Sequence, residues 1–239
     1  MISIEFKALV KSYKDVTAIN GLNAQISSGR ITGFLGPNGA GKSTTLRCLL
    51  GLAEVTSGLA LIEGKKYQEF EHPLKKVGAV LDSSGFNGAL TATQNLKVIC
   101  AEAGLDDGII PELLKLVELG HVANKRTKGF SLGMRQRLSL AMALLGDPEI
   151  LILDEPANGL DPVGIAWLRQ FLRTLADSGK TVLVSSHQLA EMQHTIDDVV
   201  IINHGNLIAA GSLDDVLRGP NGERQSLEEA FLRLIGAGK

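Results

Sequence analysis

Apolar residues recur along the chain at two spacings, one typical of strands and the other of helices. Residues 2–13 and 16–26 alternate in part between apolar and polar side chains, which predicts a small antiparallel sheet. Asn-Gly and Ser-Ser-Gly breaks are expected to separate these strands from the next apolar run. Residues 30–51 then predict a strand, a glycine-rich turn and a helix that begins near Lys42 and ends at Gly51.

The spacing becomes helical between residues 90 and 145, where apolar residues recur at intervals of three and four. This part is expected to form an inserted helical subdomain. After it, the pattern predicts strands at residues 149–154 and 181–186, a hairpin at 197–211, and helices around 163–179 and 188–195. Strands that alternate with helices imply a parallel sheet. The predicted fold class is α/β, with a mostly parallel core sheet, an N-terminal antiparallel β subdomain and an inserted helical subdomain.

The length of 239 residues suffices for one domain with several lobes. We therefore expect a single domain that spans residues 1–239. The antiparallel strands and the glycine-rich turn occupy residues 1–89, and the helical subdomain occupies residues 90–145. The rest of the core occupies residues 146–217, and a C-terminal helix occupies residues 218–239. The last part has an apolar helical face with Leu227, Phe231 and Leu234, which is expected to pack back on the core.

Composition narrows the class of protein. Hydrophobic residues make up 44% and charged residues 21% of the chain, which favours a globular fold over disorder. The longest apolar runs, at 138–145 and 150–153, are much shorter than the ~20 residues of a membrane span, and we find no signal-peptide pattern. A net charge of −2 offers no broad basic surface for nucleic acid. Cys48 and Cys100 lie far apart and are expected to be buried thiols in a reducing cytoplasm.

The glycine-rich turn reads GPNGAGKS and matches the phosphate-binding pattern G-x-x-x-x-G-K-[ST] in full. Glycines let successive N–H groups point into one concavity, and the following helix presents its positive end to the same anion. The alternative is a flexible turn that only caps the helix. Lys42 is expected to reach the β- and γ-phosphates, Ser43 to bind Mg²⁺ and Thr44 to contact the α-phosphate or the loop. The candidate nucleotide-binding residues are Gly36, Pro37, Asn38, Gly39, Ala40, Gly41, Lys42, Ser43 and Thr44.

Two adjacent carboxylates, Asp154 and Glu155, follow an apolar strand. A mononucleotide site lies at the carboxyl edge of a parallel sheet, so this strand would deliver both residues to the phosphates. Asp154 can hold Mg²⁺ through water, and Glu155 can accept a proton from the water that attacks the γ-phosphate. Like charges at the end of an apolar strand need a cation or donors to be tolerated. The alternative is that Asp154 only caps the following turn.

Between these motifs lies the sequence FSLGMRQR, at residues 130–137. With it, the chain resembles the ATP-binding subunits of ABC transporters over nearly its whole length, which implies a P-loop ATPase core. The family's LSGGQ signature corresponds to residues 130–134, of which Ser131 and Gly133 are retained. The resemblance implies two subunits that enclose two ATP molecules, each between one P-loop and the opposite signature segment. The alternative for Ser131 is a helix N-cap without a ligand.

The resemblance also implies roles for further residues. His187 matches the switch histidine, which contacts the γ-phosphate and orients the attacking water. Asp161 ends the D-loop, residues 158–161, which runs along the dimer interface, and it can also cap the helix that follows. Tyr13 corresponds to an aromatic residue that stacks on adenine, and the alternative is a plain surface tyrosine. Asp82 replaces the usual glutamine of the Q-loop, and its carboxylate is still expected to be a metal ligand, directly or through water.

The implied function is ATP hydrolysis coupled to transport, with ATP and Mg²⁺ as cofactors and Lys42, Glu155 and His187 as catalytic residues. Expected partners are an integral membrane permease and a second ATPase subunit, in a homodimer or a heterodimer, at the inner face of the cell membrane. The replacements at Leu132 and Met134 resemble those of antibiotic and peptide self-protection exporters and favour efflux. The alternative is a soluble ABC ATPase that acts on ribosomes or DNA, which would need a second ATPase domain or a long coiled coil. A kinase or GTPase is disfavoured because residues 124–127 lack the aspartate that reads guanine.

Overall fold

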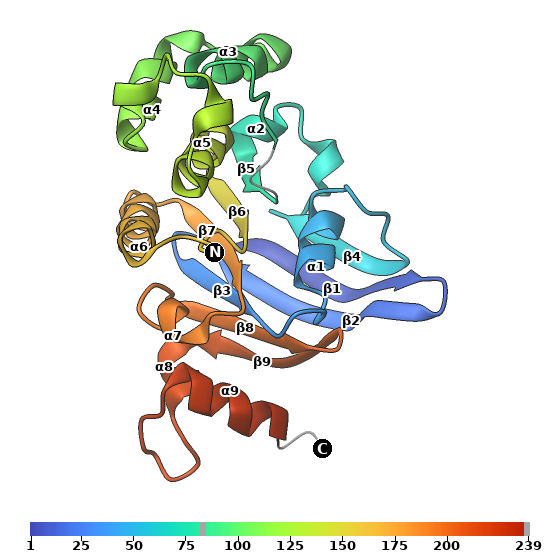
Figure 1. Ribbon diagram of the computed structural model, residues 1–239. Coiled ribbons are helices and arrows are strands. Elements are labelled where there is room, and N and C mark those ends of the chain that lie inside the picture. Colours follow the sequence, from blue (N-terminus) through green and yellow to red (C-terminus); the bar gives the residue numbers. More distant parts are fainter. Residues whose placement is uncertain (82–84, 237–239) are drawn as a thin grey trace.

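The computed structural model describes residues 1–81 and 85–236, and a six-stranded sheet forms its centre (Figure 1). The strand order is β5-β6-β7-β3-β8-β9; neighbouring strands are parallel except β8 and β9, which form an antiparallel hairpin. The bounds are Ile31–Leu35 for β3, Val77–Val80 for β5, Ile150–Asp154 for β6, Thr181–Ser186 for β7, Asp198–Asn203 for β8 and Asn206–Ser212 for β9. The predicted α/β class with a mostly parallel sheet is confirmed.

A second, antiparallel sheet has the order β2-β1-β4, with β1 at Ile2–Tyr13, β2 at Val16–Ser27 and β4 at Ser57–Ile62. The predicted N-terminal strands are thus confirmed, whereas the third strand, β4, had no clear alternating pattern. The expectation of a break at Asn-Gly was wrong, because Asn20 and Gly21 lie inside β2. Gly21 has a φ of +68°, and the register of β1 against β2 shifts at this point, so the pair forms a bulge.

Helices account for most of the remaining chain. Those between residues 90 and 145 confirm the predicted helical insertion, and the one at Leu189–Met192 is shorter than expected. The helices are α1 Lys42–Leu49, α2 Pro73–Lys76, α3 Ala92–Ala103, α4 Ile110–Leu116, α5 Leu132–Leu144, α6 Pro162–Asp177, α7 Leu189–Met192, α8 Leu213–Leu217 and α9 Leu227–Gly236. Single 3₁₀ turns lie at Tyr67–Glu69, Asp107–Ile109, Gly120–Val122 and Thr127–Gly129.

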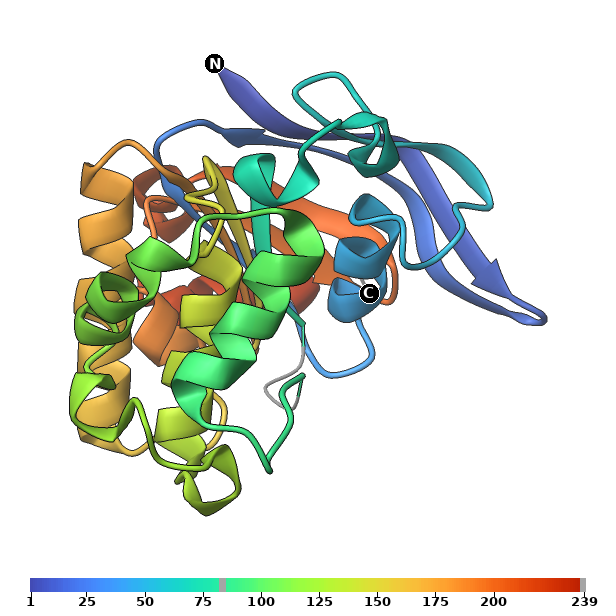
Figure 2. The ribbon, with the colours of Figure 1, turned by 90° about the horizontal axis from the view of Figure 1, so that it is seen from above.

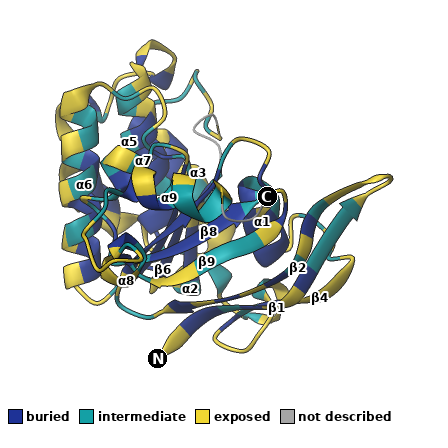
Figure 3. Ribbon diagram, turned by 90° about the horizontal axis from the view of Figure 1, so that it is seen from below, coloured by how far each residue is buried: buried dark blue, intermediate teal, exposed yellow. Residues whose placement is uncertain are grey.

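The two faces of the central sheet enter separate cores, because successive residues of a strand point to opposite sides. On β6, Leu151 and Leu153 pack with α3 to α6, whereas Ile150 and Ile152 pack with α1 and the antiparallel sheet. Helix α1 therefore lies between the two sheets (Figure 2). Seen from below, buried residues follow the central strands and exposed ones gather on the outer helix faces (Figure 3). Within the described part of the chain, no helix is both long and apolar enough to span a bilayer.

The C-terminal helix α9 packs on α7 and α8, as predicted (Figure 1). Leu227 is fully buried, and Phe231 and Leu234 are half-buried against the main core. The N–H of Leu227 donates to Gln193 Oε1 at 2.6 Å, just after α7. Cys48 and Cys100 are buried free thiols, and burial raises the pKa of each.

Candidate nucleotide-binding site

The glycine-rich loop connects the central strand β3 to α1 and is held between β2 and β8. Two of its glycines leave no room for a side chain. A Cβ on Gly36 would lie 2.4 Å from the carbonyl oxygen of Ile202, and a Cβ on Gly41 would lie 2.4 Å from that of Ala18. Gly41 also has a φ of +104°, which only glycine adopts without strain. The loop needs glycine at these positions because neighbouring backbone approaches it so closely.

Lys42 is almost fully buried, and its ammonium folds back over the loop. Its Nζ donates to the carbonyl oxygens of Gly36 at 2.7 Å and Pro37 at 3.3 Å, and lies 3.1 Å from Glu155 Oε1. A buried charge is tolerated only when it is paired or hydrogen-bonded, and Lys42 is both. The cation is thus fixed at the mouth of the loop, where an anion would bind.

Glu155 bridges Lys42 and a residue from the neighbouring strand. Its Oε2 lies 2.8 Å from Nδ1 of His187, directly after β7. Because an ionised carboxylate only accepts hydrogen bonds, Nδ1 carries the proton in this pair. The backbone of Glu155 has a φ of +50°, which is unfavourable for a residue with a side chain and costs roughly 1–3 kcal/mol. This turn directs the carboxylate into the pocket.

Ser185 organises both acidic residues from the adjacent strand, and sequence reasoning missed it. Its hydroxyl donates to Asp154 Oδ1 at 2.5 Å and accepts from the N–H of Glu155 at 2.9 Å. Ser185 is fully buried and pairs with Asp154 in the register of β6 and β7. The Asp154 carboxylate therefore contacts β7, in contrast to the alternative of a simple turn cap. A polar residue at the end of the apolar strand 181–186 is the only sequence signal for this role.

A pocket of about 280 Å³ collects most of the predicted site residues. It is lined by the loop and the start of α1, together with Glu155 and His187, which come from the ends of β6 and β7. Ala18 of β2 and Asn158 of the D-loop also line it, and neither was a candidate. The full lining is Ala18, Pro37, Asn38, Gly39, Ala40, Gly41, Lys42, Ser43, Thr44, Glu155, Asn158 and His187.

Tyr13 does not line this pocket. It ends β1, next to the turn into β2, and its side chain is about half exposed. The ammonium of Lys11 lies 4.4 Å from the centre of its ring, a cation–π contact. Ala18, on the following strand, is the part of this hairpin that reaches the pocket.

Ser131 and Gly133 lie at the start of α5, away from the pocket of their own chain. The hydroxyl of Ser131 accepts from the N–H of Met134 at 3.3 Å, so Ser131 is a helix N-cap. The signature segment contacts the D-loop: Leu132 Cδ2 would lie 2.4 Å from a Cβ on Gly159. The D-loop then ends at Asp161, whose carboxylate caps α6 through the N–H of Gly164 at 2.7 Å, as predicted.

Of the predicted metal ligands, Ser43 lines the pocket, whereas Asp154, directly before Glu155, is not among the lining residues. Within residues 1–81 and 85–236, no group of three or more His, Cys, Asp or Glu side chains could hold a metal ion by itself. The Ser43 hydroxyl and the Asp154 carboxylate are oxygen donors of the kind that Mg²⁺ accepts alongside phosphate oxygens and water. These residues fit a magnesium site that is completed by a nucleotide. Asp82, the third predicted metal ligand, lies outside the described residues.

The sequence is similar to a broad set of known proteins. The ABC transporter family model matches residues 19–158. The lantibiotic transport ATP-binding protein SrtF of Streptococcus pyogenes is 37% identical over 232 residues, 97% of each chain. The bacitracin transport ATP-binding protein BcrA of Enterococcus faecalis is 38% identical over 216 residues, which cover 89% of this chain and 70% of BcrA.

Solved structures agree with this relationship. A structure described as the ATP-binding subunit of an ABC transporter superposes with a TM-score of 0.86 at 28% identity and covers 98% of this chain and 99% of its own. A dimeric bacterial ABC transporter cassette superposes with a TM-score of 0.79 at 26% identity, over 88% of this chain and 98% of that one. The chain therefore belongs to the ABC transporter family, as one of its ATP-binding subunits that hydrolyse ATP.

Proposed function

We propose that this subunit hydrolyses ATP in the pocket between the P-loop and Glu155, as part of a dimer, and so drives export through a separately encoded permease. The observation that carries the proposal is the position of the Glu155 carboxylate, 3.1 Å from Lys42 Nζ and 2.8 Å from His187 Nδ1. A carboxylate in this place has a phosphate-binding cation on one side and an imidazole on the other. Phosphoryl transfer to water uses a cation at the phosphates and a residue that activates or orients the water, and this arrangement supplies both.

The catalytic roles follow from this geometry. Lys42 and the N–H groups of the loop bind the β- and γ-phosphates at the positive end of α1. Glu155 accepts the proton of the attacking water. His187 holds Glu155 through Nδ1–H, and its imidazole contacts the γ-phosphate and orients that water. Each residue thus acts on a different atom of the reaction.

Magnesium binding is assigned to Ser43 and Asp154. The hydrogen bond from Ser185 fixes the Asp154 carboxylate and leaves its second oxygen for the ion or for a bound water. When bound, the ion supplies charge neutralisation at the phosphates. Asp82 is proposed as a further ligand, directly or through water.

The remaining candidates act at the rim or on the other subunit. Tyr13 stacks on adenine after its ring exchanges the Lys11 cation for the base. Ser131 and Gly133 face the nucleotide bound to the second subunit, because they lie outside the pocket of their own chain. Asp161 holds the D-loop at the dimer interface through its cap on α6. The partner subunit is a second copy or a related ATPase.

The proposed cargo is an antibiotic, peptide or lipid-like compound. Two relatives with high coverage are named for lantibiotic and bacitracin transport, and the signature variant FSLGM points the same way. The subunit would then be cytoplasmic and peripheral to the inner face of the membrane through its permease. The docking site is assigned to residues 83–90, of which the structure describes 85–90 and in which Phe86 is half-buried against the core.

The test is co-purification from membranes combined with ATPase assays. The tagged full-length chain is expected to retain an integral membrane protein, and ATP turnover in reconstituted vesicles should rise with a lantibiotic or bacitracin. Disulfide cross-linking from Phe86→Cys to permease loops should localise the contact. Retention of ribosomes or DNA instead of a membrane protein would favour the soluble ABC ATPase and overturn the export proposal.

A further inference from the structure

Helix α6 begins at the D-loop and makes polar contacts with both of its neighbours in the helical layer. Towards the helical subdomain, Trp167 of α6 has the guanidinium of Arg137 from α5 4.0 Å above its ring centre. Trp167 also stacks on Phe171, with ring centres 5.0 Å apart. Helix α6, which directly follows the D-loop, is thus in contact with α5, the helix that begins at the signature segment.

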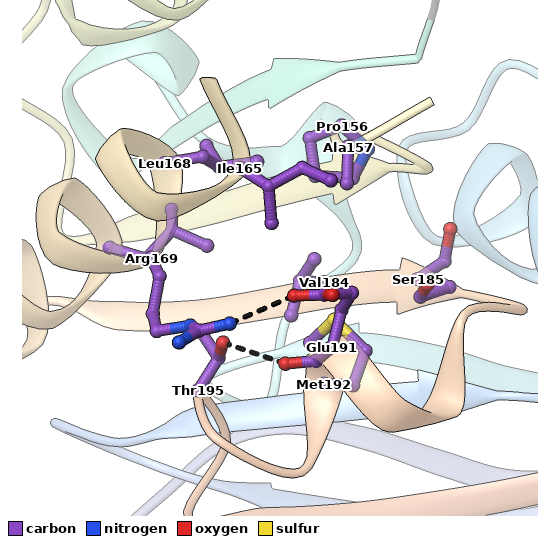
Figure 4. Close-up of a pocket in the computed structure, with 12 residues that line it drawn as sticks. Pro156, Ala157, Ile165, Leu168, Arg169, Val184, Ser185, Glu191, Met192 and Thr195 are labelled. Carbon is purple, nitrogen blue, oxygen red and sulfur yellow. Dashed lines mark hydrogen bonds and ion pairs between the residues drawn. The ribbon is translucent and has the colours of Figure 1, made fainter. Parts of the chain in front are cut away.

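Towards the core, α6 is tied to α7, the short helix that follows His187. Nη2 of Arg169 donates to Glu191 Oε2 at 2.8 Å (Figure 4). The carbonyl oxygen of Glu191 in turn accepts from the hydroxyl of Thr195 at 3.2 Å. Glu191 lies in α7, four residues after His187, so this ion pair fixes the segment that carries the switch histidine.

The Arg169 contact is incomplete. Its Nε is buried and has no hydrogen-bond partner among the residues that the structure describes. Beside it lies a cavity of about 20 Å³, lined mainly by apolar side chains such as Leu168, Val184 and Met192. A buried donor without an acceptor is costly, whereas arginine and carboxylate prefer two parallel hydrogen bonds. A shift of α7 that let Glu191 also accept from Nε would give this donor a partner.

We infer that Arg169 is a positioning residue for His187: its ion pair with Glu191 couples the D-loop helix α6 to α7 and thereby sets the position of the imidazole against Glu155. The inference rests on the proposed role of His187. The present single hydrogen bond and the two-bond arrangement are two discrete states of one contact. A displacement of the D-loop by a second subunit moves α6, shifts the balance between these states and moves His187.

This coupling should affect the chemical step and leave phosphate binding unchanged, because neither Arg169 nor Glu191 touches the P-loop. For the full-length chain, Arg169→Ala is expected to lower kcat by about 2- to 30-fold, the range for residues that couple two sites. The KM for ATP should change by less than about twofold. The pair is partly exposed, with 37% and 42% of its two side chains accessible, and such pairs contribute little to stability, so the thermal midpoint should stay close to that of the wild type.

Arg173→Ala is the matched control. Arg173 lies one turn further along α6, is as exposed as Arg169 and pairs with Asp177 and Asp197. It makes no contact with α7 among the described interactions, so its loss should leave kcat unchanged.

A double variant separates positioning from a general structural role. In a His187→Ala background, Arg169→Ala should have no further effect on kcat, because the residue through which it acts is gone. Glu191→Gln should reproduce the loss from the other side of the pair, and it replaces Arg169→Ala if that variant does not fold.

Each remaining outcome decides against the inference. If kcat stays normal in Arg169→Ala and Glu191→Gln while His187→Ala is impaired, the coupling is wrong and the proposed function stands. If Arg169→Ala lowers kcat by the same factor with and without His187, the role is structural. If His187→Ala keeps full activity, the catalytic role of His187 and the inference both fail.

Discussion

The carboxylate of Glu155 lies 3.1 Å from the ammonium of Lys42, so the residue proposed as base neutralises the residue proposed to bind phosphate. Nucleotide phosphates would have to compete with Glu155 for this cation. Binding of the nucleotide phosphates to Lys42 would thus free the Glu155 carboxylate to act as the base.

Glu155→Gln tests this link. The amide cannot accept the proton of water, so turnover should fall by about 10²- to 10⁴-fold. The lost negative charge should also increase ATP affinity several-fold, as measured with a fluorescent nucleotide. Glu149→Gln, which removes a carboxylate paired with Lys76 far from the pocket, should change neither value. Normal turnover in Glu155→Gln would exclude this residue as the base.

Lys42→Ala should weaken nucleotide binding itself. A hydrogen bond to a charged group contributes about 1.5–3 kcal/mol, so ATP affinity should fall by roughly 10- to 100-fold. Calorimetric titration with a non-hydrolysable ATP analogue measures this change. Lys180→Ala is the control, because Lys180 also donates to a carboxylate and a carbonyl, those of Asp147 and Pro148, outside the site. Equal affinity in Lys42→Ala and the wild type would remove Lys42 from the phosphate site.

Ser185→Ala should affect both stability and metal use. The N–H of Glu155 and one oxygen of Asp154 lose their partner, which should lower the free energy of unfolding by about 1–3 kcal/mol. With the Asp154 carboxylate no longer fixed, half-maximal ATPase activity should require more Mg²⁺.

Ser3→Ala provides the comparison for Ser185→Ala. The Ser3 hydroxyl is buried against Thr181, at the opposite end of β7. Its loss should destabilise the fold without changing the Mg²⁺ titration. An unchanged Mg²⁺ dependence in Ser185→Ala would show that Ser185 does not organise the metal ligand.

Gly41→Ala should disrupt the P-loop, whereas Gly39→Ala should have a smaller effect on it. The first places a Cβ 2.4 Å from the Ala18 carbonyl oxygen at a φ of +104°. The second has a φ of +80° with open space around it. We expect Gly41→Ala to lose ATP binding and Gly39→Ala to cost roughly 1–2 kcal/mol of backbone strain. Similar unfolding midpoints and affinities in both variants would contradict this steric explanation.

The parts that sequence predicted well are those whose signal is local. The P-loop motif lies between β3 and α1, and the apolar run of β6 ends at Asp154, as the pattern indicated. Strands buried on both faces and amphipathic helices also leave local patterns, so the α/β class and the helical insertion followed.

The parts that sequence missed depend on which strands become neighbours. Ser185 became part of the site because β7 pairs with β6 in a register that places it beside Asp154. Ala18 lines the pocket because β2 crosses close to Gly41. Neither neighbour can be identified from a local pattern. The sequence of β4 does not alternate clearly between apolar and polar residues, because its first three residues are all exposed at a sheet edge.

The central position of β3 has a consequence for biosynthesis. This strand leaves the ribosome early, but both of its partners, β7 and β8, come from the last third of the chain. At a translation rate of ~5–20 residues per second, β7 and β8 are synthesised on the order of ten seconds or more after the P-loop. Until translation reaches Ile202, whose carbonyl backs Gly36, the nascent polypeptide has no finished cradle to fill with ATP.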